Sequence, residues 1–336
     1  MSSYESAAGR PVSEHEVYRF SERFSALVSN VEQVIVGKRH VVEQSLICLL
    51  AQGHLLIEDR PGVGKTSLAR AVAASFGGEF RRIQFTSDLL PSDVIGTTQL
   101  PSSSISELAG ADHAAFPFVK GPIFANVVLC DEINRASPKT QSALLEIMQE
   151  RQVTVAGQKY DAEKPFMAVA TQNPLDFDGT YPLPEAQLDR FLMRVSIGYP
   201  SPEAELHLLR SEHVALPPDK LASVCELSEF TALVATAQNI LVVDAVHRYI
   251  LDLVQGTRTH PNVRIGASPR AGLALLRACR VRAGSRQRHY VDIEDVQALA
   301  TPVLAHRLLL TDDAELDRIS PDGIVQEIIK RARTPR

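Results

Sequence analysis

A lysine and a threonine stand where a glycine-rich turn meets the start of a helical pattern, in "DRPGVGKTS". The apolar run "HLLIE" before this turn is typical of a buried strand. A turn between a strand and a helix leaves backbone N–H groups unpaired, and they form an anion nest that the helix dipole reinforces. Gly62 and Gly64 let this backbone approach a ligand closely. Lys65 can then reach outer phosphates, and the Thr66 hydroxyl can hold Mg²⁺.

This stretch is a Walker A phosphate loop with one departure, because Asp59 stands where the pattern G-x-x-x-x-G-K-[ST] begins with glycine. Aspartate tolerates a left-handed backbone better than most residues, so we expect the turn to survive. The alternative is a glycine-rich turn with a surface lysine, and the flanking strand and helix argue against it. The predicted nucleotide-binding residues are Asp59, Arg60, Pro61, Gly62, Val63, Gly64, Lys65, Thr66 and Ser67.

Two carboxylates end another apolar run, "VVLCDE". Ligands of α/β sheets bind at the carboxyl ends of strands, so both acids are candidates for chemistry. Asp131 would hold Mg²⁺ through water, and Glu132 would orient or deprotonate the attacking water. A strand that merely ends in solvated acids is the alternative, and the phosphate loop upstream argues against it.

A neutral amide follows the next strand, in "ATQNP". Asn173 would lie beside Glu132 if the two strands are neighbours, and it could hydrogen-bond the water or the γ-phosphate without adding charge. The alternative is a turn asparagine before Pro174.

Two arginines could complete a phosphate site. Arg190, in "GTYPLPEAQLDRF", could reach the ATP of a neighbouring subunit, and Arg194 is the reserve candidate. The alternative for Arg190 is an ion pair with Asp189 or a solvated helix end. Arg270, in "GASPR", falls in a first helical turn, where a cation is unfavourable unless an anion such as a γ-phosphate offsets it. The alternative is an exposed arginine.

The elements that must position these residues are short apolar strands separated mostly by helices. Such alternation predicts an α/β fold with a mainly parallel sheet covered on both faces. The five predicted strands are 54–58, 80–85, 126–132, 166–171 and 192–197.

Two other regions flank this predicted sheet. We expect disorder over residues 1–12, followed by a helix that begins at a capping box of Ser13 and Glu16. The α/β domain should span 13–199, and a small all-α domain without strands should occupy 200–336.

Composition limits the class of protein. The chain has 336 residues, 45% hydrophobic and 22% charged, with a net charge of −5 that argues against general nucleic-acid affinity. Its four cysteines are too far apart for metal or redox spacing, so we expect them buried in a protein of the reducing cytosol. No apolar run approaches the ~20 residues that span a bilayer, so we expect a cytoplasmic protein.

Three longer stretches resemble the MoxR family of AAA+ ATPases: "LPSDVIGT", "FPFVKGPIFANVVLCDEINRASPKTQSALLEIMQE" and "GTYPLPEAQLDRF". The resemblance covers most of 30–200 closely and the helical lid more loosely, through "GASPRA". It implies the strand order 5-1-4-3-2, an insert in the second helix within 86–121, and a hairpin at 152–165. In the family's terms, the site residues are sensor 1 Asn173, arginine finger Arg190, sensor 2 Arg270 and the adenine-pocket residues Val36 and Gly37.

The resemblance also implies a function. Family members form ring hexamers that hydrolyse ATP with Mg²⁺ and remodel or mature protein clients, often ones with a von Willebrand factor A domain. It leaves open whether Arg270 acts on its own or a neighbour's nucleotide. "FPF" could touch a client through Phe116 and Phe118 or pack inside the insert.

Two other functions remain as alternatives. A DNA-translocating ring would use the arginines of "RACRVRAGSRQRH", although cations at the end of a helix have a simple electrostatic explanation. A nucleotide-gated adaptor would bind ATP and barely hydrolyse it, and the set Glu132, Asn173 and Arg190 argues against it. The arginines concerned are Arg277, Arg280, Arg282, Arg286 and Arg288.

Overall fold

The computed structural model describes residues 12–98, 117–155, 157–173, 180–203, 205–206 and 216–333. The disorder expected for the N-terminal residues therefore falls, except for Val12, outside the described residues. Helix α1 (Glu14–Glu32) begins at the predicted capping box. The Glu16 carboxylate accepts the backbone N–H of Ser13, and the Ser13 hydroxyl accepts the N–H of Glu16. Two orphan N–H groups of the helix start are thereby satisfied.

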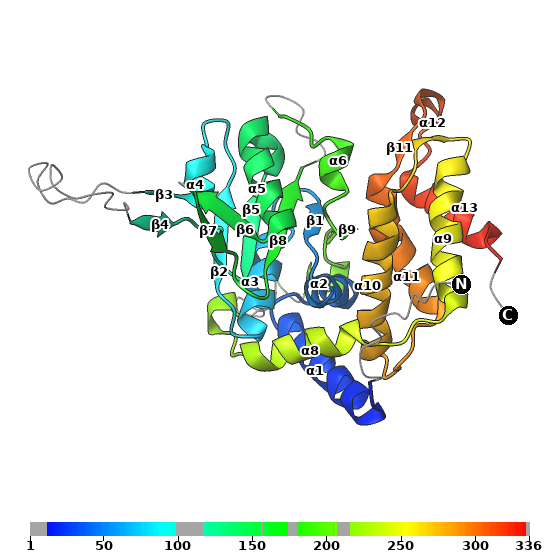
Figure 1. The fold of residues 1–336 in the computed structure, drawn as a ribbon, viewed down its shortest axis with the longest axis horizontal. Helices are drawn as coiled ribbons and strands as arrows, with labels where there is room; N and C mark the ends of the chain where they lie inside the picture. The colour runs from blue at the N-terminus through cyan, green and yellow to red at the C-terminus, as the bar shows by residue number, and fades with distance from the viewer. Residues whose placement is uncertain are drawn as a thin grey trace, which may run out of the picture.

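Five parallel strands form the central sheet (Figure 1). Their order confirms the predicted 5-1-4-3-2 arrangement, because the second, third, fourth, first and fifth sheet strands of the chain lie side by side. From one outer strand to the other, the order is β2 (Phe80–Gln84), β5 (Val127–Asp131), β8 (Met167–Gln172), β1 (Leu55–Glu58) and β9 (Met193–Val195).

Both faces of this sheet are apolar, as continuous hydrophobic strands predict. In β8, Met167 and Val169 belong to one core cluster, whereas Ala168 and Ala170 belong to the other. The first cluster packs under α1, α2 (Arg39–Leu50) and α3 (Lys65–Ser75). The second packs under α4 (Pro91–Ile95), η2 (Ile133–Arg135) and α5 (Pro138–Glu150).

Two antiparallel hairpins project from the sheet region (Figure 1). One joins β3 (Gly96–Thr98) to β4 (Phe118–Lys120), and the other joins β6 (Gln152–Val155) to β7 (Gln158–Asp161). The Phe118 ring lies 4.3 Å from Tyr160 and 5.8 Å from Phe124, measured between centroids. Phe118 therefore packs between the hairpins, whereas Phe116 lies outside the described residues.

The second part of the chain is mostly helical. After the short η3 (Pro218–Lys220) it contains α8 (Leu227–Gln238), α9 (Asp244–Thr259), α10 (Pro269–Ser285), α11 (Ile293–Leu304), η4 (Ala305–Arg307), α12 (Asp312–Leu316) and α13 (Pro321–Arg331). The expectation that this part has no strand is wrong, since β10 (Val263–Ile265) pairs with β11 (Leu309–Leu310). Strands of three and two residues, separated in the chain by α10, α11 and η4, are too short to carry a detectable period-2 pattern.

The helical part shares one continuous core with the α/β part. At their contact, a Cβ placed on Gly284 of α10 would lie 2.9 Å from the Phe20 ring of α1, so only glycine allows the two helices to approach this closely. All four cysteines are buried and free, as predicted. Within the described ranges, no helix has the length and apolar character needed to cross a membrane.

Candidate nucleotide-binding site

The glycine-rich turn adopts the backbone that an anion nest needs. Gly62 has φ = 83° and Gly64 has φ = 93°, both in the left-handed region that favours glycine. Gly64 is the N-cap of α3, which begins at Lys65. The chain therefore passes from β1 through a tight turn directly into a helix N-terminus, and the N–H groups of that terminus face the same side as the turn.

A cavity of about 540 Å³ lies over this turn at the carboxyl end of the sheet. It brings together the phosphate loop, both acids and the amide that were predicted to act together. The residues that line it are Pro61, Gly62, Gly64, Lys65, Thr66, Ser67, Arg82, Gln84, Asp131, Glu132 and Asn173.

One buried hydroxyl forms hydrogen bonds that position both acids. Thr171, fully buried in β8, donates to Asp131 Oδ1 at 2.6 Å and accepts the backbone N–H of Glu132 at 2.9 Å. Glu132 has φ = 57°, a left-handed backbone that is costly for a residue with a Cβ. The hydrogen bond from its N–H to Thr171 helps to hold this conformation, which turns the Glu132 side chain into the cavity.

Strand β2 supplies two partners that the sequence analysis missed. Arg82 Nη2 lies 2.6 Å from Asp131 Oδ2, and Gln84 Nε2 donates to Glu132 Oε2 at 3.0 Å. Arg135 Nε lies 3.3 Å from the same Glu132 oxygen. The signal was present: residues two apart in a strand share a face, and β2 neighbours β5.

Lys65 is folded back onto its own loop, where Nζ donates to the Asp59 carbonyl at 2.8 Å. Partial burial lowers the pKa of Lys65, and the carboxylates of Asp131, Asp59 and Glu132 oppose that shift. The amine thus lies at the cavity with the Asp59 carbonyl as its hydrogen-bond partner, and a bound phosphate could replace that carbonyl.

Asp59 does not play the part expected from its position. Its backbone is not left-handed, so tolerance of positive φ is not why the loop accepts aspartate. Its Oδ2 accepts the N–H groups of Ile197 at 2.6 Å and Gly198 at 2.7 Å, and the Ser196 hydroxyl at 3.1 Å. Burial disfavours the charged form, but these donors outweigh it and lower the pKa of Asp59. Asp59 thus ties the phosphate loop to the chain after β9.

A second, more apolar pocket adjoins the loop and contains the predicted residues Val36 and Val63. Gly37 does not line it but turns the chain there, with φ = 74°. The guanidinium of Arg60 lies 5.8 Å from the centroid of the Tyr199 ring, outside both pockets. The lining residues are Val34, Ile35, Val36, Lys38, Gly62, Val63, Gly64, Ser67, Ile197, Gly198 and Pro200.

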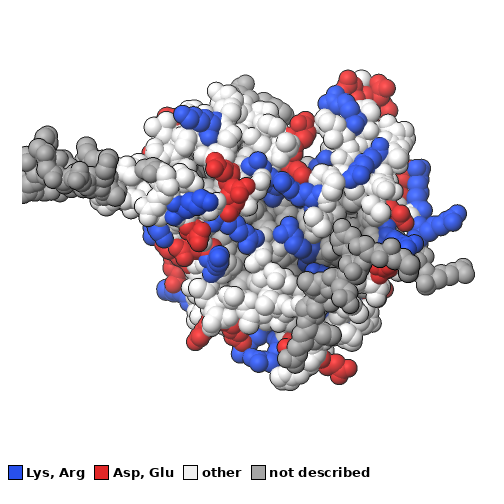
Figure 2. All heavy atoms as spheres, in the orientation of Figure 1, with Lys and Arg blue, Asp and Glu red and all other residues white. Residues whose placement is uncertain are grey.

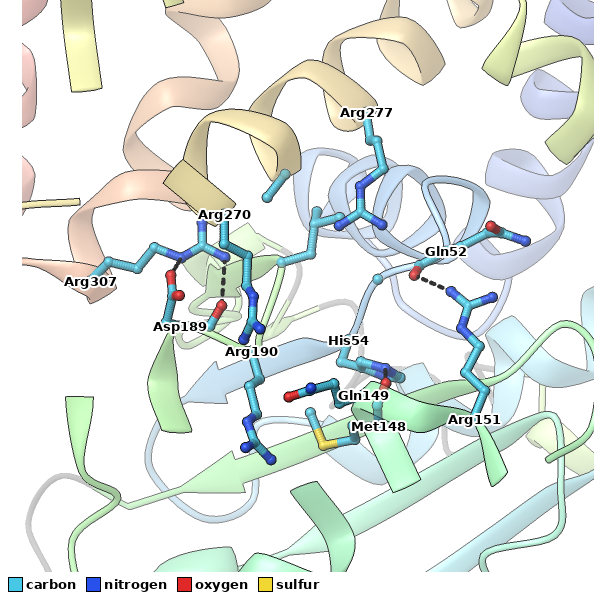
Figure 3. Close-up of a pocket in the computed structure, with 13 residues that line it drawn as sticks. Gln52, His54, Met148, Gln149, Arg151, Asp189, Arg190, Arg270, Arg277 and Arg307 are labelled. Atoms are coloured by element: carbon cyan, nitrogen blue, oxygen red, sulfur yellow. Dashed lines mark hydrogen bonds and ion pairs between the residues drawn. The ribbon is translucent and has the colours of Figure 1, made fainter. Parts of the chain in front are cut away.

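Arg190 and Arg270 lie together where the parallel strands begin (Figure 3). We call this end of the sheet the amino edge, and the opposite end, where the strands finish and the phosphate loop lies, the carboxyl edge. The phosphate loop follows β1, whereas Arg190 follows α6 (Glu185–Leu188) and precedes β9, which runs parallel to β1. The two sites are therefore at opposite ends of neighbouring parallel strands. Figure 3 shows Arg270 descending from α10 toward Arg190.

We call this second site the arginine pocket. Among the residues that the structure describes, Asp189 is the only acid that lines it. Figure 2 shows Lys and Arg gathered where the α/β and helical parts meet. The residues that line it are Gln52, Gly53, His54, Met148, Gln149, Arg151, Asp189, Arg190, Leu192, Arg270, Ala274, Arg277 and Arg307.

The expected alternative partner of Arg190 is engaged elsewhere. Asp189 Oδ1 lies 3.0 Å from Arg307 Nε, and within the described ranges neither Arg190 nor Arg270 has a carboxylate in ion-pair distance. Arg194 is held between Glu58 at 3.1 Å and Asp322 at 2.6 Å, so the reserve candidate lies in structural ion pairs.

Among the described residues, the cations that line the arginine pocket outnumber the acids. Burial lowers the pKa of Arg307 to about 10; Asp189 opposes that shift, and the neighbouring Arg277 and Arg270 add to it. Burial also lowers the pKa of Arg277, with a further lowering by Arg151. In the part of the chain that the structure describes, several cations thus face one lining carboxylate, an arrangement that an external anion would stabilise.

The arginines proposed for DNA contact do not form one free patch. Arg282 and Arg288 both lie within 4 Å of the buried carboxylate of Asp295, the closest approach being 2.6 Å from Arg288. Arg286 lies 3.7 Å from Glu43, and Arg277 faces the arginine pocket. Carboxylates and the arginine pocket thus engage most of these arginines, which argues against a DNA-binding patch; the predicted explanation through the helix C-terminus stays a prediction.

Thr66 and Asp131 fit a magnesium ion held partly by phosphates. Both line the phosphate cavity, and Mg²⁺ typically takes one or two protein oxygens together with water and phosphate oxygens. Among the residues that the structure describes, no group of three or more His, Cys, Asp or Glu is arranged as a metal site. An ion there would rely on the triphosphate for the rest of its ligands.

Comparisons with known proteins agree with this geometry. A family model described as ATPase family associated with various cellular activities (AAA) matches residues 54–193, and an AAA lid domain model matches 255–328. YeaC of Bacillus subtilis (strain 168) is 46% identical over 92% of this chain and 93% of its own. Chaperone MoxR1 of Mycobacterium tuberculosis is 40% identical over 92% and 81%. A solved structure from Cytophaga hutchinsonii has a TM-score of 0.85 at 33% identity, covering 96% and 98%.

A parallel sheet of this order, a phosphate loop with acids on the neighbouring strands and a helical lid define an AAA+ ATPase, an enzyme that binds and hydrolyses ATP. The chain belongs to the MoxR family of these ATPases. AAA+ proteins generally assemble as oligomeric rings.

Proposed function

We propose that this ATPase hydrolyses ATP at sites shared between adjoining subunits of a ring. The observation that carries the proposal is the position of Arg190 and Arg270 at the sheet edge opposite the phosphate loop. A side chain there cannot reach the nucleotide of its own subunit, but it can face a neighbour's. The arginine pocket would then place its cations against the neighbour's phosphates.

In this proposal, Lys65 and the N–H groups of the loop hold the phosphates, while Thr66 and Asp131 hold Mg²⁺, the latter through water. Glu132 accepts the proton of the attacking water, and Asn173 orients that water or the γ-phosphate. Mg²⁺ would neutralise charge that develops on the phosphates. The apolar pocket beside Val36 would take the adenine.

Arg190 and Arg270 would stabilise the charge of the transferred phosphoryl group from the neighbouring subunit. We therefore assign Arg270 to action in trans, since it shares a pocket with Arg190 and not with Lys65. In domain terms, residues 13–199 would form the nucleotide-binding unit and 200–336 the lid.

The work driven by hydrolysis is proposed to be the remodelling or maturation of a protein client in the cytoplasm. Support comes from the relative named Chaperone MoxR1 and from the resemblance noted above, which points to clients with a von Willebrand factor A domain. A hexamer is the ring that the resemblance favours. The ion pairs of Arg282, Arg286 and Arg288 argue against the DNA-translocase alternative.

Mixing two inactive variants tests the shared site. Arg190→Ala should lower turnover by roughly 10³-fold or more while leaving ATP binding intact, and Glu132→Gln should also bind ATP without turnover. A mixed ring places an intact Arg190 beside an intact Glu132, so activity should return. Absence of recovery at every mixing ratio would contradict shared sites.

The client is tested separately. Glu132→Gln rings loaded with ATP should retain a client in a pull-down, and Lys65→Ala rings serve as the matched control that cannot bind nucleotide. Equal recovery of a von Willebrand factor A domain protein with both variants would contradict ATP-dependent binding. A steep rise of wild-type ATPase rate with added DNA would favour translocation instead.

A further inference from the structure

The residue before Arg190 is held by the helical part of the molecule. The Ser268 hydroxyl donates to the Asp189 carboxylate, with 3.0 Å and 2.9 Å to its two oxygens. The Arg307 guanidinium forms an ion pair with the same carboxylate at 3.0 Å and donates to the Asp189 carbonyl at 3.2 Å. Figure 3 shows both Arg307 contacts as dashed lines.

The residue after Arg190 is held in the same way. The Phe191 carbonyl accepts from Arg307 at 2.5 Å and lies 3.2 Å from His306 Nε2. Arg190 itself is left to point into the arginine pocket. The backbone on both sides of Arg190 is thus fixed to η4 and to the start of α10, which carries Arg270.

The Ser268 side chain contacts Asp189 and does not cap its own helix. It occupies the N-cap position of α10, where a serine hydroxyl normally accepts an N–H of the first turn, yet it makes no side-chain cap hydrogen bond. Its hydroxyl goes to Asp189 instead. The first turn of α10, and with it Arg270, is therefore anchored to the carboxylate beside Arg190.

Arg307 is built into the protein interior for the same contact. Its side chain is 2% exposed, and its Nη1 donates a hydrogen bond to the Val303 carbonyl at 2.6 Å. A buried guanidinium without its carboxylate would be strongly disfavoured, so Asp189 and Arg307 hold each other in place.

We propose that Asp189, Ser268 and Arg307 form a clamp that positions Arg190 relative to Arg270, so that lid position controls how well a subunit completes its neighbour's site. The inference rests on the proposed function, because it assumes that Arg190 acts in trans. The three clamp residues are positioning residues that act through Arg190.

The clamp is also connected to the subunit's own phosphate loop. Strand β9 starts just after Arg190, and Asp59 binds the N–H groups of Ile197 and Gly198 just after β9 ends. A shift of the phosphate loop on nucleotide binding would therefore reach Arg190 through the hydrogen bonds of Asp59 and the short chain segment 190–198. The clamp would let the lid fix the position of the Arg190 end of this segment.

The experiment uses Asp189→Asn in the full-length ring. A displacement of Arg190 by about 1 Å is expected to lower kcat on the order of 10²-fold while the KM for ATP stays unchanged, because the variant's own phosphate site is intact. Mixing with Glu132→Gln subunits should restore turnover, since these donate a correctly held Arg190. A merely structural defect would not be repaired by a neighbour.

Asp322→Asn is the matched control, because it removes another carboxylate between β9 and the helical part, at Arg194. It should leave kcat close to wild type. If Arg190→Ala is rescued by mixing but Asp189→Asn is not, the clamp is refuted and the shared site stands. If Arg190→Ala is not rescued, the shared site fails and the clamp fails with it.

Ser268→Ala provides the test should Asp189→Asn lose its folded state in thermal unfolding. It should lower kcat by a smaller factor, with recovery on mixing, and Ser268→Thr should restore the rate in uniform rings. An unchanged kcat for folded Ser268→Ala would overturn the proposal.

Discussion

The two edges of the parallel sheet differ in the sign of the charge they expose and in how that charge is balanced. At the carboxyl edge, Asp131 and Glu132 are each paired with a donor from β2, and Lys65 has a partner within its own loop. At the amino edge, the arginine pocket has one lining carboxylate among the described residues, and it is paired with Arg307. The carboxyl edge thus holds acids and a lysine that already have partners, whereas the amino edge gathers cations around a single described acid.

The largest effect should come from two variants at the carboxyl edge, one that removes nucleotide binding and one that removes only the hydrolysis step. Lys65→Ala should abolish nucleotide binding, whereas Glu132→Gln should bind ATP and lower turnover by about 10²- to 10⁴-fold, because only the proton acceptor is lost. Binding measured by calorimetry beside steady-state turnover checks this. Equal loss of binding in both variants would contradict the roles assigned to the two residues.

The next largest effect should come from Arg270, and it tests whether this residue acts on its own subunit's nucleotide or on a neighbour's. Arg270→Ala should lower kcat by roughly 10²- to 10³-fold, as expected when one donor to a developing charge is removed. Mixing with Glu132→Gln subunits should restore turnover if Arg270 acts in trans. Mixed rings that stay inactive would place Arg270 on its own subunit's nucleotide. Arg264→Ala, an exposed arginine of the helical part away from the pocket, is the control.

A third effect concerns the floor of the arginine pocket. His54 is buried, accepts the Ala168 N–H at Nδ1 and so presents Nε2–H to the Met148 carbonyl. Burial lowers the pKa of His54 to about 4, and Arg151 and Arg277 add to the shift. The unfolded chain, with a histidine pKa near 6.5, binds this proton first as pH falls. The free energy of unfolding should therefore drop by up to about 3 kcal/mol between pH 6.5 and 4.

Urea unfolding at pH 7 and pH 5 measures this dependence. His54→Gln should flatten it in part, since burial also lowers the pKa of His306 and adds a dependence of the same sign. His40→Gln, which replaces an exposed histidine, is the matched control. An unchanged slope in His54→Gln would show that the buried imidazole does not stay neutral in the folded protein.

The smallest effect should be at Thr171, beneath the two acids. Thr171→Val removes a buried hydroxyl and leaves Asp131 Oδ1 and the Glu132 N–H without that partner, so we expect a loss of about 1 to 3 kcal/mol in stability. Thr171→Ser keeps the hydroxyl and should retain most of the turnover. Thermal unfolding together with turnover checks both. Full activity in Thr171→Val would show that Glu132 holds its left-handed backbone unaided.

Much of the carboxyl edge could be predicted because its residues are contiguous with strong local patterns. A strand, two glycines and a helix start locate Lys65, and the end of an apolar run locates Asp131 and Glu132. The strand order came from the resemblance alone, since parallel strands leave no local trace of their neighbours. Arg82 and Gln84 were missed because their importance depends on that order.

The amino edge could be predicted only in part. Arg190 and Arg270 were found through their local stretches. Nothing local shows that Arg307 joins them, because its contacts with Asp189 and Phe191 span 118 and 116 residues of sequence. The role of Asp59 was misjudged because its partners, Ile197 and Gly198, lie at the far end of another strand. Interactions that depend on tertiary packing leave no periodic signal in the sequence.

The placement of Arg190 and Lys65 at opposite ends of the sheet restricts the symmetry of any assembly. In a two-fold dimer, the same surface patch of both subunits forms the interface, so Arg190 and Lys65 would both have to lie on that one patch. A head-to-tail contact joins unlike ends of the sheet without this requirement, and such contacts either close into a cycle or continue as a filament. A chain built this way therefore has a direction around its assembly, and each subunit has one neighbour that it serves and another that serves it.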